Sequence, residues 1–167
     1  KLTENNFMGR GQSVGFAIGT TSDNRELSFN FTEPKLYDRD LALGLRVAFY
    51  TTNDDSLAYN TRRSQFRPSL TFPTGEYSRL TPSMLFENNR ITPDANASPL
   101  IAAERGSRST LGLGLGYAYD KRNSPVKPTS GFIFGIDQSL AGVAGGNKYY
   151  KAVTNAKAYK SMLNEEV

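Results

Sequence analysis

A Gly-x-Ser-x-Gly sequence is the first candidate for catalysis in this chain. It spans residues 11–15, with Ser13 at its centre. In a hydrolase this sequence forms a sharp turn from a strand into a helix, and a histidine accepts the proton of the serine. The chain contains no histidine, and Ser13 lies inside an alternating pattern that predicts a strand. The sequence therefore does not indicate a nucleophile.

Closely spaced glycines are the second candidate for binding chemistry. Gly9 and Gly11 flank Arg10, and alternate glycines run through residues 112–116. A phosphate cradle needs the N-terminus of a helix directly after its glycines. The alternation continues straight through residues 112–116, so we interpret these glycines as space for close packing within a sheet.

Acidic loops and the absence of cysteine limit the metal chemistry. Asp23, Asp54 and Asp55 offer the oxygen ligands that Ca²⁺ prefers, but no EF-hand spacing surrounds them. The chain has no cysteine, which excludes thiolate sites and disulfide bonds and suits an oxidising compartment. We therefore expect no enzymatic activity, no catalytic residue, no metal site and no cofactor.

The composition also argues against several classes of protein. The 167 residues are 38% hydrophobic and 22% charged, and the net charge of +4 is dispersed over predicted loops, which does not favour nucleic acid binding. No run of about 18 apolar residues predicts a transmembrane helix. Residues 1–6 lack the charged and apolar regions of a signal peptide, so an exported protein with this sequence is expected to begin upstream of Lys1.

An alternation with a period of two dominates the chain. In residues 41–50, Leu, Val and Phe side chains fall on one face of a predicted strand, and Ala, Gly, Arg and Tyr fall on the other. In residues 111–120, leucines and then tyrosines alternate with glycine, alanine and aspartate. Segments of about ten residues can cross a bilayer as tilted strands, and tyrosines that end an apolar row suit the membrane–water interface.

Similar patterns predict the other strands. They occupy residues 11–20, 25–32, 62–72, 77–89, 131–140 and 148–162, with a tight turn at 73–76, long polar loops at 51–61 and 89–107, and a short helix at 98–104. The connections are too short for parallel crossovers, so the prediction is an all-β fold in which about eight strands form an antiparallel meander.

Alternation alone leaves two all-β architectures open. In a soluble β-sandwich the apolar face packs against a second sheet and the other face is charged. Here the second face is mostly Gly, Ala, Ser and Thr, which suits the crowded interior of a barrel whose apolar face meets lipid. The composition therefore favours part of a transmembrane β-barrel.

Two segments are more specific than the alternation. The first combines residues 6–13, NFMGRGQS, with residues 27–34, LSFNFTEP. It resembles the early barrel strands of BamA-type Omp85 proteins, in which a glycine-containing turn leads to a strand that ends at proline. The residues that carry the resemblance are Phe7, Gly9, Gly11, Glu33 and Pro34.

The second segment is a proline-rich turn at residues 119–131, YDKRNSPVKPTSG. Its prolines fix φ and remove hydrogen-bond donors, Asp120 can hold Arg122 across the turn, and Gly131 allows the next strand to start. The segment is similar to a periplasmic turn of the same family. The matching residues are Tyr119, Asp120, Arg122, Asn123, Pro125, Pro128 and Gly131.

The resemblance implies an orientation and a domain organisation. Residues 5–11, 33–40, 73–76 and 120–130 would face the periplasm, and residues 21–24, 51–61, 89–107 and 141–147 would lie outside the cell. Residues 1–167 would form a partial barrel domain, because the family's POTRA domains, first strand and closing strands have no counterpart in this sequence.

The resemblance further implies a function in the bacterial outer membrane. The chain would be a barrel segment of a factor that folds and inserts other β-barrel proteins. Nascent outer-membrane proteins, periplasmic lipoproteins of an assembly complex and outer-membrane lipid would be its partners. Two alternatives stay open, namely a TamA-like or two-partner secretion transporter of the same family and a passive porin-like or adhesin barrel.

Overall fold

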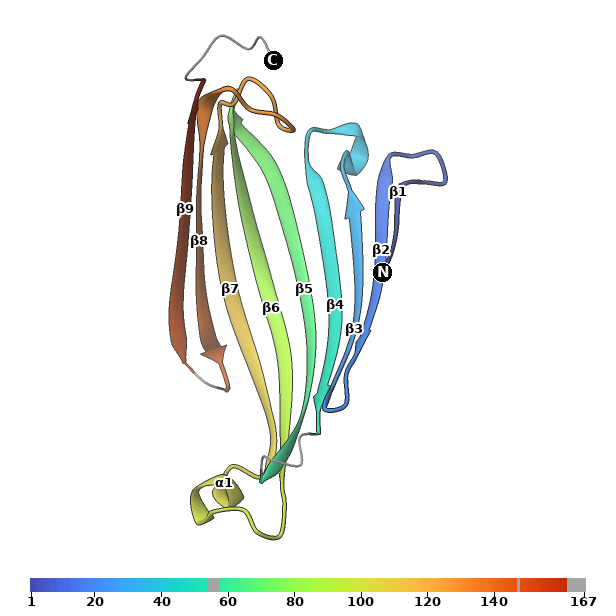
Figure 1. Ribbon diagram of the computed structural model, residues 1–167, viewed down its shortest axis with the longest axis vertical. Helices are drawn as coiled ribbons and strands as arrows, with labels where there is room; N and C mark the ends of the chain where they lie inside the picture. The colour runs from blue at the N-terminus through green and yellow to red at the C-terminus, as the bar shows by residue number, and fades with distance from the viewer. Residues whose placement is uncertain (54–57, 147, 162–167) are drawn as a thin grey trace.

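A computed structural model describes residues 1–53, 58–146 and 148–161 of the chain. It contains nine strands, a 3₁₀ turn η1 (Leu36–Asp38) and a short helix α1 (Pro99–Ala103), as Figure 1 shows. The strands are β1 (Leu2–Phe7), β2 (Gln12–Thr20), β3 (Asn24–Glu33), β4 (Ala42–Thr52), β5 (Tyr59–Gly75), β6 (Ser78–Pro93), β7 (Gly106–Asp120), β8 (Ser130–Ala144) and β9 (Tyr149–Lys160).

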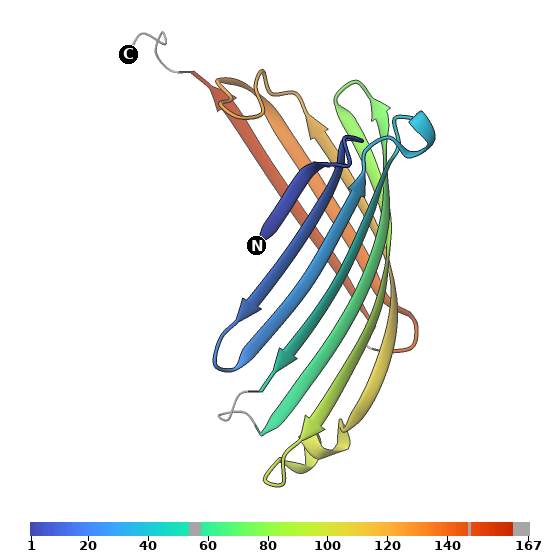
Figure 2. The same cartoon turned by 90° about the vertical axis from the view of Figure 1, so that its right-hand side faces the viewer.

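All nine strands belong to one antiparallel sheet in which each strand pairs with its neighbours in the chain. The sheet curves strongly, and its strands are steeply inclined (Figure 2). Within the described residues it is open, with β1 and β9 as its edges. The predicted all-β antiparallel meander is confirmed.

The connections alternate between two rims of the sheet. We call the end with the β1–β2, β3–β4, β5–β6 and β7–β8 connections the turn rim, and the opposite end the loop rim. The turn rim is at the top of Figure 1, and α1 lies at the loop rim below. Ser98 caps α1 by accepting a hydrogen bond from the Ile101 amide at 3.4 Å, and α1 lies within residues 98–104, where the sequence allows a short helix without requiring one.

One face of the sheet, which we call the outer face, carries a row of apolar side chains across its middle. Residues opposite each other in neighbouring strands lie on the same face, so the register places one row of apolar side chains across seven strands. This row consists of Leu2, Phe16, Phe29, Val47, Phe66, Phe86 and Leu111. Most of the large side chains on this face are exposed in the sheet, which suits a surface in contact with lipid hydrocarbon.

The opposite, inner face is polar and crowded. Arg46 lies 4.0 Å from Glu26, and the Gln65 amide donates to Glu87 at 2.5 Å. Small residues are closely packed there: a Cβ on Gly44 would lie 2.6 Å from the Ser69 hydroxyl. Crowding of this kind is expected on the inside of a curved sheet, as the sequence predicted for the interior of a barrel.

Several boundaries differ from the sequence prediction. Residues 2–7 form β1, whereas residues 5–11 were expected as a turn, so the sheet has nine strands rather than about eight. The strand β5 extends through residues 73–75 and β6 begins at Ser78, so the tight turn is at residues 76–77 instead of 73–76. The calcium candidates Asp54 and Asp55 lie outside the described residues.

No helix among the described residues is long and apolar enough to cross a membrane.

Candidate functional site: two motif clusters on the turn rim

The nine-residue connection between β7 and β8, residues 121–129, is held by a charged fork at its start. The Arg122 guanidinium donates to both carboxylate oxygens of Asp120, at 2.8 and 2.6 Å, and also to the Pro125 carbonyl at 3.3 Å. Bidentate pairs of this kind are stronger and more directional than single ion pairs. The carboxylate raises the pKa of Arg122 above its usual value, so the guanidinium stays charged. The contact predicted between these two residues is present.

Asn123 closes the middle of the same connection. Its side-chain oxygen accepts hydrogen bonds from the Thr129 and Ser130 amides at 3.0 and 3.1 Å, and its side-chain nitrogen donates to the Thr129 hydroxyl at 2.7 Å. These bonds fold residues 123–130 into a closed loop. Pro125 and Pro128 lie inside that loop, where the fixed φ and missing donor of proline cause no loss of strand pairing.

Gly131 allows the chain to return into β8. Its φ is +100°, a conformation that side chains disfavour, and a Cβ at this position would collide with the Lys121 backbone carbonyl. The Lys121 amide donates to the Phe132 carbonyl at 2.9 Å, which brings the two strand ends together at this point. The close approach therefore requires glycine.

An aromatic cluster surrounds the base of the connection. The rings of Tyr119 and Phe132 stack with centroids 5.2 Å apart, and Tyr77 lies 6.1 Å from Tyr119. The Lys121 ammonium lies 5.5 Å from the centre of the Tyr77 ring. Aromatic rings with polar tips at the end of an apolar face are typical of a membrane–water interface.

The second cluster joins the β1–β2 turn to the end of β3. Gly9 and Gly11 have φ values of +72° and +70° in this turn, which follows Phe7 at the end of β1. Gly11 faces Pro34, since a Cβ built on Gly11 would lie 3.8 Å from that ring. The fold therefore places the two halves of the early-strand motif next to each other, with no room for more than a Cβ between Gly11 and the Pro34 ring.

Hydrogen bonds reinforce this second cluster. The Gln12 amide donates to Glu33 at 2.5 Å, and the other oxygen of Glu33 accepts from the Lys35 amide at 3.1 Å. The Asn6 side chain accepts from the Gly11 amide at 2.7 Å. Asn6 and Gln12 lie in the motif segment 6–13 but were not among the residues predicted to carry the resemblance. The bond of Gln12 to Glu33 depends on the pairing of β2 with β3.

The two clusters share the turn rim but do not touch. The first lies on β7 and β8 and the second on β1, β2 and β3, with β4, β5 and β6 between them in the sheet. Within the described residues there is no group of three or more metal-binding side chains. The described residues of both clusters hold backbone shape at the rim, and their contacts are structural rather than those of a nucleophile and a base.

Comparison with known proteins assigns a family to this architecture. A profile described as the Omp85 superfamily domain matches residues 6–167. The curated protein "Outer membrane protein assembly factor BamA" of Nitratidesulfovibrio vulgaris is 24% identical over 169 residues, which is 99% of this chain and 21% of that protein.

A solved structure has the same fold. It is the crystal structure of BamA from Haemophilus ducreyi lacking POTRA domains 1–3, with a TM-score of 0.70 and 20% identity over 92% of this chain and 32% of that one. The chain thus spans about a fifth of the curated relative and about a third of the solved chain. Because the profile match covers nearly the whole sequence, the chain belongs to the Omp85 superfamily of outer-membrane β-barrel proteins.

Proposed function

We propose that the chain is a barrel segment of an outer-membrane assembly factor, which folds and inserts other β-barrel proteins. The observation that carries this proposal is the similarity to a protein named as such an assembly factor along 99% of the chain. The Asp120–Arg122 turn and the proximity of Gly11 to Pro34 support it, because they give physical shape to the two segments that resemble BamA-type proteins.

The proposed mechanism is non-enzymatic. An incoming strand would pair with an exposed sheet edge of the parent barrel, and its main-chain groups would gain hydrogen bonds that are costly to leave unmade in lipid. Residues 1–167 would then be a partial barrel domain, with the POTRA domains, first strand and closing strands of the parent outside this sequence. The segment described here would serve as a scaffold that holds the seam in shape.

The proposal includes an orientation and a set of partners. The turn rim would face the periplasm, where lipoproteins of an assembly complex act, and the loop rim would face the outside of the cell. Nascent outer-membrane proteins would be the substrates, and outer-membrane lipid would contact the apolar outer face. The length and dense hydrogen bonding of the β7–β8 connection support a defined surface at the turn rim rather than a plain reversal of the chain.

Reconstitution of the full-length parent protein tests the function. A urea-denatured porin would be diluted into phosphatidylcholine vesicles with and without the parent protein, and folded porin would be followed by its altered gel mobility before heating. Faster folding in the presence of the parent is the expected result. A porin that folds at the same rate in both preparations contradicts the proposal and favours a secretion transporter or a passive barrel.

A further inference from the structure

A row of arginines crosses the outer face near the loop rim. Arg25 lies opposite Thr51, Thr51 opposite Arg62, and Arg62 opposite Arg90, so all four side chains are on the same face of four consecutive strands. All three arginines are exposed. They project from the outer face, one row nearer the loop rim than the row that contains Leu27 and Phe49.

Arg25, Arg62 and Arg90 have different surroundings from Arg46 and Arg63 on the inner face. On the inner face, Arg46 lies near Glu26, and Arg63 lies 4.6 Å from the centre of the Tyr50 ring. Within residues 1–53, 58–146 and 148–161, no ion pair involves Arg25, Arg62 or Arg90. Arg62 and Arg90 are directly opposite each other, an arrangement of like charges that weakens strand pairing unless an anion lies between them.

A polar pocket surrounds the opposed pair. It has a volume of about 540 Å³ and is lined by Asn53, Asn60, Arg62, Arg90 and Thr92. The Asn60 amide donates to Asp94 at 3.5 Å. The guanidinium groups and the Thr92 hydroxyl can donate several hydrogen bonds to a ligand, and two guanidinium forks match the geometry of a phosphate group.

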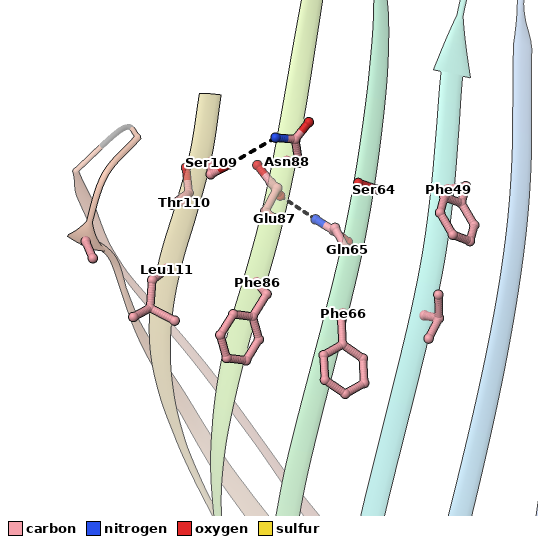
Figure 3. A pocket seen from close by; sticks show the side chains of 12 residues that line it. Phe49, Ser64, Gln65, Phe66, Phe86, Glu87, Asn88, Ser109, Thr110 and Leu111 are labelled. Carbon is pink, nitrogen blue, oxygen red and sulfur yellow. Dashed lines mark hydrogen bonds between the residues drawn. The ribbon is translucent and has the colours of Figure 1, made fainter. Parts of the chain in front are cut away.

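An apolar groove lies next to this pocket on the same face, on the side toward the middle of the sheet. Figure 3 shows Phe66, Phe86 and Leu111 side by side along its floor, with Phe49 one row nearer the loop rim. Its volume is about 440 Å³, and Ser64, Asn88 and Ser109 line the end that is nearest the arginines. The Asn88 side chain donates to the Ser109 hydroxyl at 3.0 Å.

From the loop rim inward, these groups follow the same order as the parts of a phospholipid-like molecule, from its charged headgroup to its hydrocarbon chain. Successive rows on one face of a strand are about 7 Å apart. Moving from the loop rim toward the middle of the sheet, the face therefore presents arginines, then the Ser64 and Asn88 row, and then the Phe66 and Phe86 row. This sequence of charge, hydrogen-bonding groups and hydrocarbon corresponds to a phosphate, a polar backbone and an acyl chain.

We propose that this surface binds a phosphorylated lipid of the leaflet at the loop rim. Arg62 and Arg90 hold the phosphate, Arg25 adds charge beside it, and one acyl chain lies along Phe66 and Phe86. The proposal goes beyond the assembly function, and it takes only the orientation from it, which makes this leaflet the outer one. Basic side chains at a membrane surface attract anionic headgroups in this way.

A lipid-binding measurement on the full-length parent protein tests the proposal. The protein would be placed in phosphatidylcholine nanodiscs, diphosphorylated lipid A would be titrated in as the probe, and bound lipid would be measured by native mass spectrometry. Arg62→Gln with Arg90→Gln removes the opposed pair. Arg46→Gln with Arg67→Gln is the matched control, because these residues are also directly opposite each other but lie on the inner face.

The expected result is weaker binding of lipid A to the outer-face variant alone, by roughly fivefold for each arginine removed. Arg62→Lys with Arg90→Lys should lose less, because the charge remains and only the forked geometry is lost. Gel mobility before heating reports whether each variant still folds.

Three results would overturn the proposal. If wild type and the outer-face variant bind lipid A equally well, Arg62 and Arg90 do not form a binding site. If the inner-face control loses as much affinity as the outer-face variant, the loss follows from net charge alone. If inorganic phosphate binds as tightly as lipid A, the pocket is a site for a free anion and the acyl chain does not contribute to binding. None of these measurements depends on insertion activity, so failure of the lipid site and failure of the assembly function are distinguishable.

Discussion

Two neighbouring connections on the turn rim close their hairpins in different ways. Between β5 and β6, two residues suffice, and neither has a positive φ. Between β7 and β8, nine residues are folded by the Asp120–Arg122 fork and the Asn123 bonds. The Tyr77 carbonyl of the short turn accepts from the Asp120 amide at 2.8 Å, so the short turn supports the base of the long one.

The difference indicates what the long connection is for. A short turn is enough to reverse the chain, so nine ordered residues provide surface as well as reversal. Substitutions in the long connection should therefore disturb the rim in proportion to the contacts they remove. Side-chain changes in the short turn should have little effect, because this turn supports the long connection through the Tyr77 backbone carbonyl.

The largest effect is expected for Gly131→Ala. The new Cβ would collide with the Lys121 backbone carbonyl, which cannot move without opening the hairpin, so unfolding should require about 3 kcal/mol less. Gly9→Ala is the control, since φ is also positive there but nothing lies within 4 Å of the new Cβ, and its expected cost is about 1 kcal/mol. Urea unfolding of the full-length protein measures both, and equal costs would contradict the collision.

The next largest effect is expected when the hydrogen-bonded pair of Asp120 and Arg122 is removed, and it should appear in the amide exchange rates of the long connection. Arg122→Ala frees the start of the connection, and amide exchange in residues 121–130 should accelerate on the order of tenfold. Arg122→Lys should give an intermediate rate because the fork is lost and the charge is kept. Hydrogen exchange with mass spectrometry measures these rates. Lys127→Ala, a change of the same charge in the same connection, should leave them unaltered, and matching rates in both alanine variants would refute the role of the fork.

A smaller loss is expected at Asn123. Asn123→Ala removes three hydrogen bonds at an exposed site where water can replace them, so the cost in unfolding free energy should be about 1 kcal/mol. Asn123→Asp keeps the oxygen that accepts from Thr129 and Ser130 and should be close to wild type. If the aspartate variant is as unstable as the alanine variant, closure of the loop depends on the donor to Thr129 instead.

The smallest effect concerns the short turn and pH. A hydrogen bond and the charge of Glu76 raise the pKa of Tyr77 above its usual value, so the stabilising contribution is complete below the unfolded pKa and is lost as the pH rises through the folded one. Glu76→Gln should lower the Tyr77 pKa, as measured by ultraviolet difference titration against Tyr77→Phe. An unchanged titration would show that Glu76 does not act on this ring.

Much of the fold could be predicted from the sequence because one face of the sheet is apolar. Residues 41–50 and 111–120 alternate cleanly, and residues 42–50 lie in β4 and residues 111–120 in β7. The turn at residues 119–131 was also predictable, since proline, glycine and an Asp–Arg pair constrain the backbone locally. In these segments the residue types of the segment itself were sufficient to predict its structure.

Features set by pairing could not be predicted. All of β1 is exposed and its sequence, LTENNF, has no apolar alternation, so it becomes a strand through its pairing with β2. The strands predicted at residues 62–72 and 77–89 already run through Pro68 and Pro82, although proline interrupts a ladder, but β5 and β6 extend beyond these bounds to residues 59–75 and 78–93. The β5–β6 register has gaps between Phe66 and Ser69 and between Ser69 and Phe72, yet both strands continue.

The two clusters and the arginine row also depend on strand pairing, which the sequence alone does not give. The proximity of Gly11 to Pro34 depends on which residues of β2 and β3 are opposite each other, and a single sequence does not reveal that register. The arginine row was missed for the same reason, because Arg25, Arg62 and Arg90 are far apart in the chain and only the sheet aligns them.

Depletion of the full-length parent protein in its own bacterium tests the assembly function most directly. Every other outer-membrane barrel protein would be quantified by mass spectrometry as the parent is lost. The account predicts a general fall in barrel proteins, porins included. Loss of only one or a few secreted proteins with unchanged porins would contradict it and indicate a secretion transporter, and no change beyond the parent itself would leave a passive barrel.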